Sequence, residues 1–185
     1  EHFTSVQAER KLILLISGLP APIRNETILI GCPAGETHTF PLLLITLMLQ
    51  RKGFNVLYLG ANIPAEQLQE TLSNIKIQLV ILAAQRLVTA ASLFHSAQII
   101  RGLGIPVAFG GLIFNQLPDL TSKIPGNFLG EDLSNAPAAI EKLLVSHPNI
   151  YEIIPVTTEF AELSTQLNIN QSLIDNELSR YFSET

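Results

Sequence analysis

The sequence predicts an α/β fold, a doubly wound sheet of five parallel strands, and three observations support this prediction. Five short apolar runs rich in β-branched residues are typical of strands, at 27–32, 55–60, 77–84, 105–109 and 127–130. Several of them are apolar on both faces, as expected for parallel strands that helices cover on each side. Segments with helical spacing alternate with these runs, at 41–52, 65–75, 89–103 and 132–146. This alternation is typical of a doubly wound sheet, in which the connection 110–126 is the least regular.

The segments outside this alternation divide the chain into three regions. Residues 1–25 comprise a predicted helix over 2–17 and a Pro-rich linker, and residues 26–148 form the sheet domain. Residues 149–185 are predicted to be a C-terminal extension that is partly helical. Its last helix carries an apolar stripe that packs either on the sheet domain or on a second subunit. A homodimer through the terminal helices is therefore one expectation.

The composition excludes several classes of protein. With 47% hydrophobic and 15% charged residues among 185, the chain is expected to fold rather than stay disordered. Its 11 basic residues are scattered and outnumbered by 16 acidic ones, which argues against direct nucleic-acid binding. No apolar run approaches the ~20 residues that a membrane span requires. A single cysteine excludes an internal disulfide and a cysteine-based zinc site, and it favours a reducing, cytoplasmic location.

Ligands of an open parallel sheet bind outside the carboxyl ends of its strands, so the loops there hold the candidate site residues. The loop after the first strand contains Cys32, Glu36, Thr37, His38 and Pro41; the loops after the third and fourth contain Ala83, Gln85, Arg86, Gly110 and Gly111. These spacings match neither the P-loop nor the GxGxxG motif. The sequence therefore argues against a nucleotide-phosphate site of either type.

Glu36 and His38 are the residues of this set with the clearest chemistry. A carboxylate near an imidazole fixes its tautomer and raises its basicity. One histidine without a cysteine cluster would not hold a bare zinc ion, but it suffices as an axial ligand to a metal already held by a macrocycle. Gly110 and Gly111 would let a ligand approach the backbone closely, or they mark a tight turn.

Three threonines near the same loops have two interpretations. Thr37, Thr39 and Thr89 would either bond a ligand or cap helices, and capping is favoured for Thr39 and Thr89.

The order of these loops resembles the cobalamin-binding domain family. The resemblance lies in Glu36-Thr-His38, in the small residues at Ala83, and in Gly110-Gly111. Over about residues 26 to 146, phrases such as GETHTFPLLLITLML, GFNVLYLGANIPAEQL and PGNFLGE are similar to cobalamin-binding light and redox regulators of the MerR type.

The resemblance implies a flavodoxin-like fold and a cobalt-binding role for His38, as lower axial ligand with Glu36 as its partner. It implies that Ala83 lies beside the dimethylbenzimidazole tail and that the paired glycines give the tail room. Pro41 stands where the family has glycine, and Ala83 where it has serine. Residues 2–17 resemble the last helix of the family's helical cap.

Cys32 supports an alternative ligand, a linear tetrapyrrole (bilin) attached through its thiolate. His38 and Glu36 would then contact pyrrole nitrogens, and Arg86 would pair with a propionate. The other interpretation of Cys32 is an inert buried thiol.

Three functions remain open from the sequence. The first choice is a tetrapyrrole-binding sensory domain, with cobalamin as ligand and light as input, regulatory rather than enzymatic. The second is a cobalamin-carrying subunit of a mutase or methyltransferase. The third is a docking domain without a cofactor.

Overall fold

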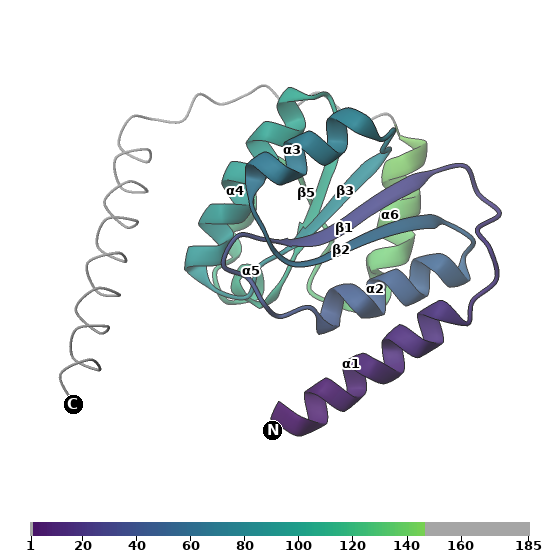
Figure 1. Ribbon diagram of the computed structural model, residues 1–185. Coiled ribbons are helices and arrows are strands. Elements are labelled where there is room, and N and C mark those ends of the chain that lie inside the picture. Colours follow the sequence, from purple (N-terminus) through teal and green to yellow (C-terminus); the bar gives the residue numbers. More distant parts are fainter. Residues whose placement is uncertain (1, 147–185) are drawn as a thin grey trace. The chain divides into compact units, whose positions relative to one another are not determined.

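The computed structural model describes the backbone of residues 2–146 and the side chains of residues 7–146 (Figure 1). The helices predicted within the C-terminal extension lie outside these residues. In the described part of the chain, no helix combines the length and the apolar character that crossing a bilayer requires.

The sheet has five strands, and every pairing between them is parallel. The strands are β1 (Thr27–Pro33), β2 (Asn55–Ile63), β3 (Leu79–Ala83), β4 (Val107–Gly110) and β5 (Asn127–Phe128). Their order across the sheet is β2-β1-β3-β4-β5, which is the flavodoxin-like order. The predicted fold class is confirmed, and the order reverses between β1 and β3, where ligands bind in such sheets.

The helices follow the predicted alternation. They are α1 (His2–Ser17), α2 (Phe40–Arg51), α3 (Ala65–Asn74), α4 (Leu87–Gly102), α5 (Leu112–Gln116) and α6 (Ala136–Val145). The helix predicted over 132–146 begins later, because the Asp132 carboxylate caps a 3-10 turn at Leu133–Asn135 and proline stands in the first turn of α6. The irregular connection 110–126 contains α5 and a second 3-10 turn, Pro118–Ser122.

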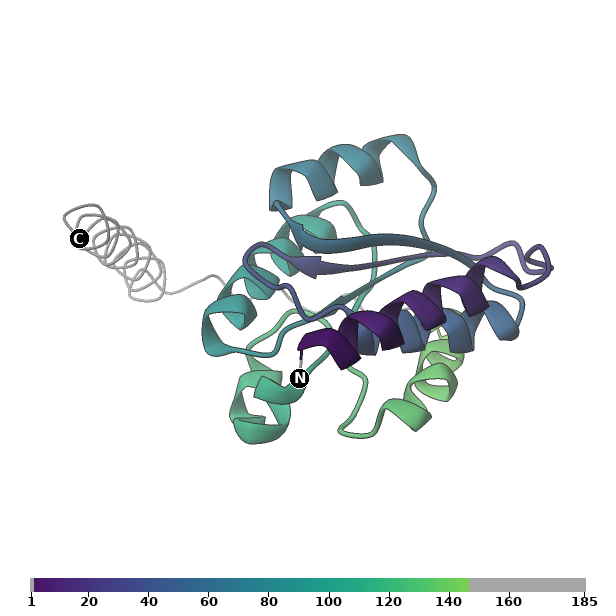
Figure 2. The same ribbon diagram turned by 60° about the horizontal axis from the view of Figure 1, so that its bottom comes forward.

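Two apolar layers enclose the sheet, because successive side chains of a strand point to opposite faces. Leu29 and Val80 pack with residues of α3 and α4 in one layer. Ile28 and Ile81 pack with residues of α2 and α6 in the other layer. Figure 2 shows α3 on one side of the sheet and α2 with α6 on the other. The strands are buried from both sides, as their continuous apolar runs predict.

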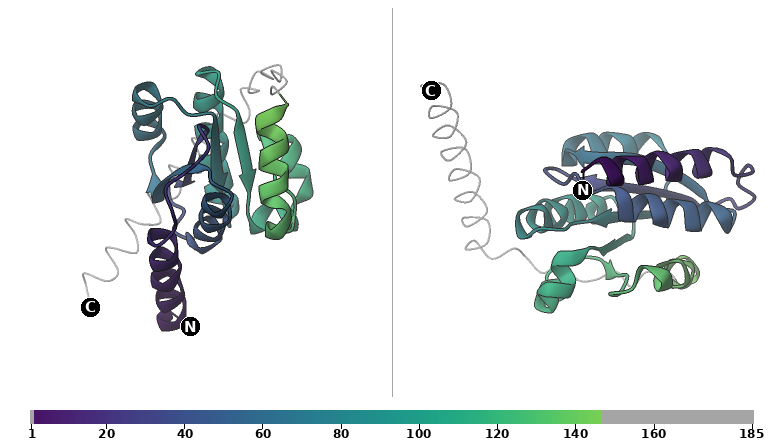
Figure 3. Two further views of the ribbon diagram at one scale, coloured as in Figure 1. Left: turned by 90° about the vertical axis from the view of Figure 1, so that its right-hand side faces the viewer. Right: turned by 90° about the horizontal axis from the view of Figure 1, so that it is seen from below.

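Helix α1 lies beside α2, as two views agree (Figures 1 and 3). Leu12 is buried, whereas Ile13, Leu14 and Leu15 are exposed.

The linker after α1 is attached at the amino end of the sheet. The backbone N–H groups of Ile23 and Arg24 both donate to the carbonyl of Gly53, and the Arg24 guanidinium lies 3.8 Å from the centre of the Phe54 ring. Arg24 also pairs with Glu26 at 2.8 Å and with Glu141 at 3.3 Å.

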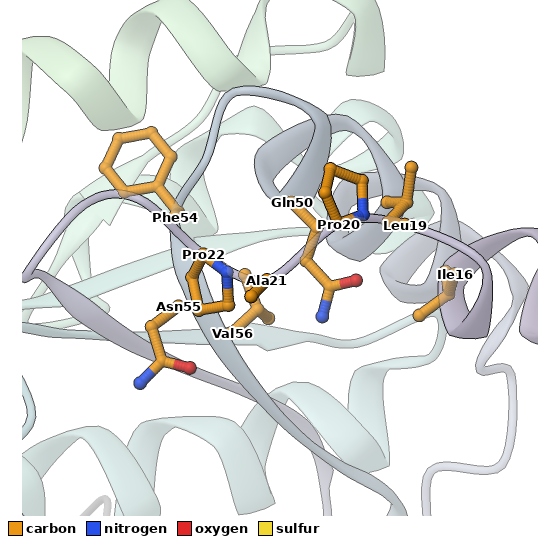
Figure 4. A pocket seen from close by; sticks show the side chains of 9 residues that line it. All are labelled: Ile16, Leu19, Pro20, Ala21, Pro22, Gln50, Phe54, Asn55 and Val56. Atoms are coloured by element: carbon orange, nitrogen blue, oxygen red, sulfur yellow. The ribbon is translucent and has the colours of Figure 1, made fainter.

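A shallow pocket of about 200 Å³ lies beside this linker (Figure 4). Its lining combines the end of α1, the linker, α2 and the start of β2, and consists of Ile16, Leu19, Pro20, Ala21, Pro22, Gln50, Phe54, Asn55 and Val56. This lining holds no ionisable side chain, and the pocket lies at the sheet edge opposite the predicted site.

Candidate functional site

The loop after β1 buries a carboxylate at the carboxyl edge of the sheet. Glu36 is completely buried. Its Oε1 accepts the backbone N–H groups of Thr37 and His38, both at 3.0 Å. Its Oε2 accepts the N–H of Gln85 at 2.7 Å and the hydroxyl of Thr89 at 2.6 Å. The carboxylate thereby ties the loop after β1 to the loop after β3.

These hydrogen bonds decide the charge state of Glu36. Burial by itself acts to raise the pKa of this carboxyl group, but the donors of Thr89, Gln85 and His38 outweigh it. The pKa of Glu36 falls from an ordinary 4.5 to about 2. Glu36 is therefore an anion at neutral pH, although it is enclosed by protein.

The same carboxylate orients the imidazole of His38. Oε1 of Glu36 lies 2.6 Å from Nδ1 of His38, whose side chain is 60% exposed. An ionised carboxylate can only accept a hydrogen bond, so Nδ1 carries the proton. When Nδ1 carries the single ring proton, Nε2 keeps its lone pair, which is the arrangement of a metal-binding histidine held by a carboxylate.

Thr89 completes this network, although the sequence favours only a capping role for it. Its hydroxyl accepts the N–H of Arg86 at 3.2 Å, which caps the start of α4, and donates to Glu36. Glu36 lies 53 residues from Thr89 in the sequence, on the loop after the neighbouring strand β1, and no local pattern indicates such a contact. Thr89 therefore belongs to the site as well as to the helix terminus.

Side chains of the loop after β3 also form hydrogen bonds with the neighbouring loops. Oε1 of Gln85 accepts the N–H of Leu112 at 3.0 Å, and Nη2 of Arg86 donates to the carbonyl of Gly35 at 2.7 Å. Oδ1 of Asn62, at the end of β2, accepts the N–H of Gly35 at 2.7 Å. Sequence reasoning did not select Asn62. The available signal is an asparagine that closely follows the predicted strand 55–60, since asparagine tolerates a left-handed backbone. Asn62 adopts this conformation, with a φ of 54°.

The two glycines at the carboxyl end of β4, Gly110 within the strand and Gly111 after it, have different surroundings. Gly110 pairs with Ala83 across the sheet, and a Cβ added to Gly110 would meet no atom within 4 Å. A Cβ on Gly111 would overlap the carbonyl oxygen of Ala84, and the φ of Gly111 is +125°. Gly111 is thus a glycine that the fold requires. A side chain at Gly110 would therefore enter open space, as it would at Gly60 and Gly130.

Cys32 does not present its thiol to this edge. Its side chain is completely buried in the layer formed with α2 and α6, and Sγ donates to the carbonyl of His38 at 3.7 Å. Burial, with a smaller contribution from the charge of Glu36, raises the pKa of the thiol to about 12. Since the thiolate is the nucleophile, the bilin alternative loses its attachment site. The interpretation of Cys32 as an inert core thiol fits the structure.

The remaining residues of the loop after β1 are placed as follows. Thr37 is exposed and Pro41 stands in the first turn of α2. Thr39 occupies the N-cap position of α2, but the expectation that its side chain caps the helix is wrong. Its hydroxyl donates instead to Oε1 of Glu9 in α1, at 2.8 Å.

Large apolar side chains are exposed around the same edge. Phe40, Leu87, Val88 and Leu112 are between 37% and 55% exposed. They lie in the first turns of α2, α4 and α5, which all begin at the carboxyl ends of strands. These four side chains form an exposed apolar rim near the imidazole that Glu36 orients. Such a surface suits a broad, mostly apolar ligand.

The family comparison agrees with this geometry. The model of the B12 binding domain matches residues 26–136. The chain belongs to the B12-binding domain family. That match includes every candidate residue at the carboxyl edge.

Two curated proteins are similar to this B12-binding domain. The HTH-type transcriptional repressor CarA of Myxococcus xanthus is 34% identical over 87 residues, covering 46% of this chain and 30% of the repressor. The methanol–corrinoid protein of Methanosarcina barkeri is 25% identical over 136 residues, covering 71% of this chain and 51% of that protein. The chain thus spans between about a third and a half of these relatives.

Solved structures share the fold. A cobalamin-binding protein from Desulfitobacterium hafniense superimposes with a TM-score of 0.59 at 15% identity, covering 64% of this chain and 58% of that one. The methanol:cobalamin methyltransferase complex of Methanosarcina barkeri superimposes with a TM-score of 0.62 at 23% identity. This match covers 72% of this chain and 52% of that one.

The residues of this B12-binding domain fit a corrinoid. In the part of the chain that the structure describes, no three His, Cys, Asp or Glu side chains gather as a metal-binding group. A bare ion would therefore lack a ligand set. His38 offers one exposed nitrogen donor, and a single donor would suffice for a metal already held by a macrocycle.

Proposed function

We propose that this chain is a cobalamin-binding regulatory domain in which His38 is the lower axial ligand of cobalt. The observation that carries the proposal is the exposed His38 ring, whose Nδ1 lies 2.6 Å from the buried Glu36 carboxylate. Adenosylcobalamin, when bound, supplies a cobalt–carbon bond that light can break.

The protein's own groups have separate parts in this proposal. Glu36 holds the Nδ1 proton of His38, so that Nε2 faces the ligand as a neutral donor. Thr89 and the N–H of Gln85 keep Glu36 ionised. Gly110 leaves room at the sheet edge, and the exposed apolar rim contacts the macrocycle.

The regulatory assignment is supported by the likeness to the transcriptional repressor CarA. Light is proposed as the input because the matching loops are similar to those of light-responsive regulators. The described residues show no second acid–base or nucleophilic set near His38 that would serve an enzyme, and we propose that the domain is not itself catalytic.

The likeness to the methanol–corrinoid protein favours a second candidate, a corrinoid carrier for methyl transfer. A carrier needs the same axial histidine, so ligand binding alone does not separate the two. A sensor must change the chain when the ligand changes, because a ligand shifts an equilibrium only through its different affinity for two states.

The test is an absorption titration with adenosylcobalamin in the dark. We expect the wild-type chain to bind it with imidazole ligation, which His38→Ala removes and His95→Ala, at an exposed position on α4, retains. Gly110→Ala should fold normally and bind more weakly, because its methyl group enters the open space. Failure of the wild-type chain to retain any corrinoid would contradict the proposal and favour the docking domain.

A second measurement separates sensor from carrier. Hydrogen exchange of the loaded chain is compared in the dark and after illumination. A light-dependent change in the protection of the protein supports the sensor. Unchanged protection, together with methyl transfer from bound methylcobalamin to a thiol acceptor in the presence of a methyltransferase, supports the carrier.

A further inference from the structure

We propose that Asn62 and Arg86 are positioning residues that hold the His38 loop in its ligand-binding conformation by hydrogen-bonding to both backbone polar groups of one residue, Gly35. The inference rests on the proposed cobalamin function of His38. The juxtaposition is specific: Gly35, which immediately precedes Glu36, is bonded by a side chain from the end of β2 and by one from the loop after β3.

The two bonds use both polar groups of Gly35. Its N–H donates to Oδ1 of Asn62 at 2.7 Å, and its carbonyl accepts Nη2 of Arg86 at 2.7 Å. Gly35 has a φ of +78°, a conformation that glycine adopts without steric cost but does not prefer. The two side chains therefore select one conformation from several that the residue can reach.

Asn62 holds the loop through its backbone as well. Its N–H donates to the carbonyl of Glu36 at 2.9 Å. Asn62 has a left-handed φ of 54°, which asparagine and aspartate adopt more readily than other side chains. Asn62 thus bonds both the residue before the carboxylate and the carboxylate residue itself.

The consequence for the ligand follows from the position of Glu36. Its Oε1 orients the His38 ring, so any rotation of the turn at Gly35 changes where Nε2 points. A metal ligand that is already oriented does not lose further freedom on binding. Loss of the hydrogen bonds to Gly35 should therefore lower the fraction of cobalt that is ligated by imidazole, with little change in the free energy of unfolding.

The variants distinguish the hydrogen bond made by the Asn62 side chain from the backbone conformation of that residue. Asn62→Asp keeps an acceptor for Gly35 and tolerates the left-handed φ. Asn62→Gly keeps the backbone conformation but loses the acceptor. Arg86→Ala removes the opposite bond. Asn74→Ala and Arg51→Ala are matched controls on α3 and α2, away from the carboxyl edge.

The measurements are made on the full chain with and without cobalamin. Without ligand, hydrogen exchange at the Gly35 amide measures how firmly the turn is held. Nitrogen NMR of His38 identifies the tautomer of its ring. With cob(II)alamin, EPR of protein labelled with nitrogen-15 histidine shows whether an imidazole nitrogen is coupled to cobalt.

We expect Asn62→Gly and Arg86→Ala to weaken imidazole ligation by about three- to tenfold, the effect of one hydrogen bond. Asn62→Asp should stay close to the wild type, and the double variant Asn62→Gly/Arg86→Ala should lose less than the product of the single losses. Faster exchange at Gly35 should accompany each loss.

Three results would overturn the inference. Unchanged Gly35 exchange in Asn62→Gly would show that the side chain does not hold the turn. Faster exchange with unchanged ligation would show that the turn does not position His38. A wild-type chain without imidazole coupling would instead refute the proposed function, and the inference with it.

Discussion

The two ends of the sheet both gather charged side chains, yet they use them differently. At the carboxyl edge, Glu36 is completely buried, and its partners are backbone N–H groups, a hydroxyl and an imidazole. At the amino end, Glu141 is about a third exposed, and its partners are Arg24 and Lys52. The pKa of both carboxyl groups is lowered, in Glu141 chiefly by the hydrogen bond from Lys52.

The comparison shows that the burial of a carboxylate, rather than its number of partners, decides how strongly it orders the loops around it. Exposed ion pairs stabilise little because water and salt compete for them. A buried anion with all its acceptors satisfied imposes one arrangement on the loops that donate to it. The amino end thus attaches a linker, whereas the carboxyl edge orients the imidazole of His38.

The largest expected effect comes from removing the buried carboxylate. Glu36→Ala leaves the Gln85 N–H and the Thr89 hydroxyl without their acceptor, and we expect a loss of about 3 kcal/mol in the free energy of unfolding. The matched change Glu141→Ala should cost far less. Urea denaturation of both variants measures the difference, and equal losses would contradict the comparison.

Acid should act on the same carboxylate. Folding lowers the pKa of Glu36 from 4.5 to about 2, so between these values the folded chain binds fewer protons than the unfolded chain. Stability contributed by Glu36 is therefore complete above about pH 5 and is lost as the pH falls toward 2, by on the order of 3 kcal/mol. Unfolding measured across this range should show a shallower slope in Glu36→Gln than in the wild type.

A smaller effect should distinguish two buried threonines. Thr89→Val removes a donor to Glu36, and we expect it to cost about 1–2 kcal/mol and to raise the pKa of Glu36. Thr46→Val is the control, because the Thr46 hydroxyl donates to the Leu42 carbonyl within α2 and its loss should cost under about 1 kcal/mol. Carbon NMR of the Glu36 carboxyl group follows its pKa, and an unchanged value in Thr89→Val would contradict the proposed network.

Much of the fold was predictable from sequence, because continuous apolar runs and helical spacing are local patterns. The alternation of strands and helices, the parallel sheet and the loops at its carboxyl edge all follow from them. The family resemblance was readable for the same reason, since Glu36-Thr-His38 and Gly110-Gly111 are short segments. The late start of α6 was missed, because the Asp132 cap competes with helical spacing.

The interactions that complete the site depend on the tertiary structure. Glu36 meets Thr89 across 53 residues, and Asn62 meets Gly35 across 27. Whether Cys32 faces the core or the edge depends on how β1 enters the sheet, which no local pattern shows. By itself the sequence determined which residues arrive at the carboxyl edge. Only the folded chain decided which of them touch, because hydrogen bonds require an alignment of loops that sequence spacing does not specify.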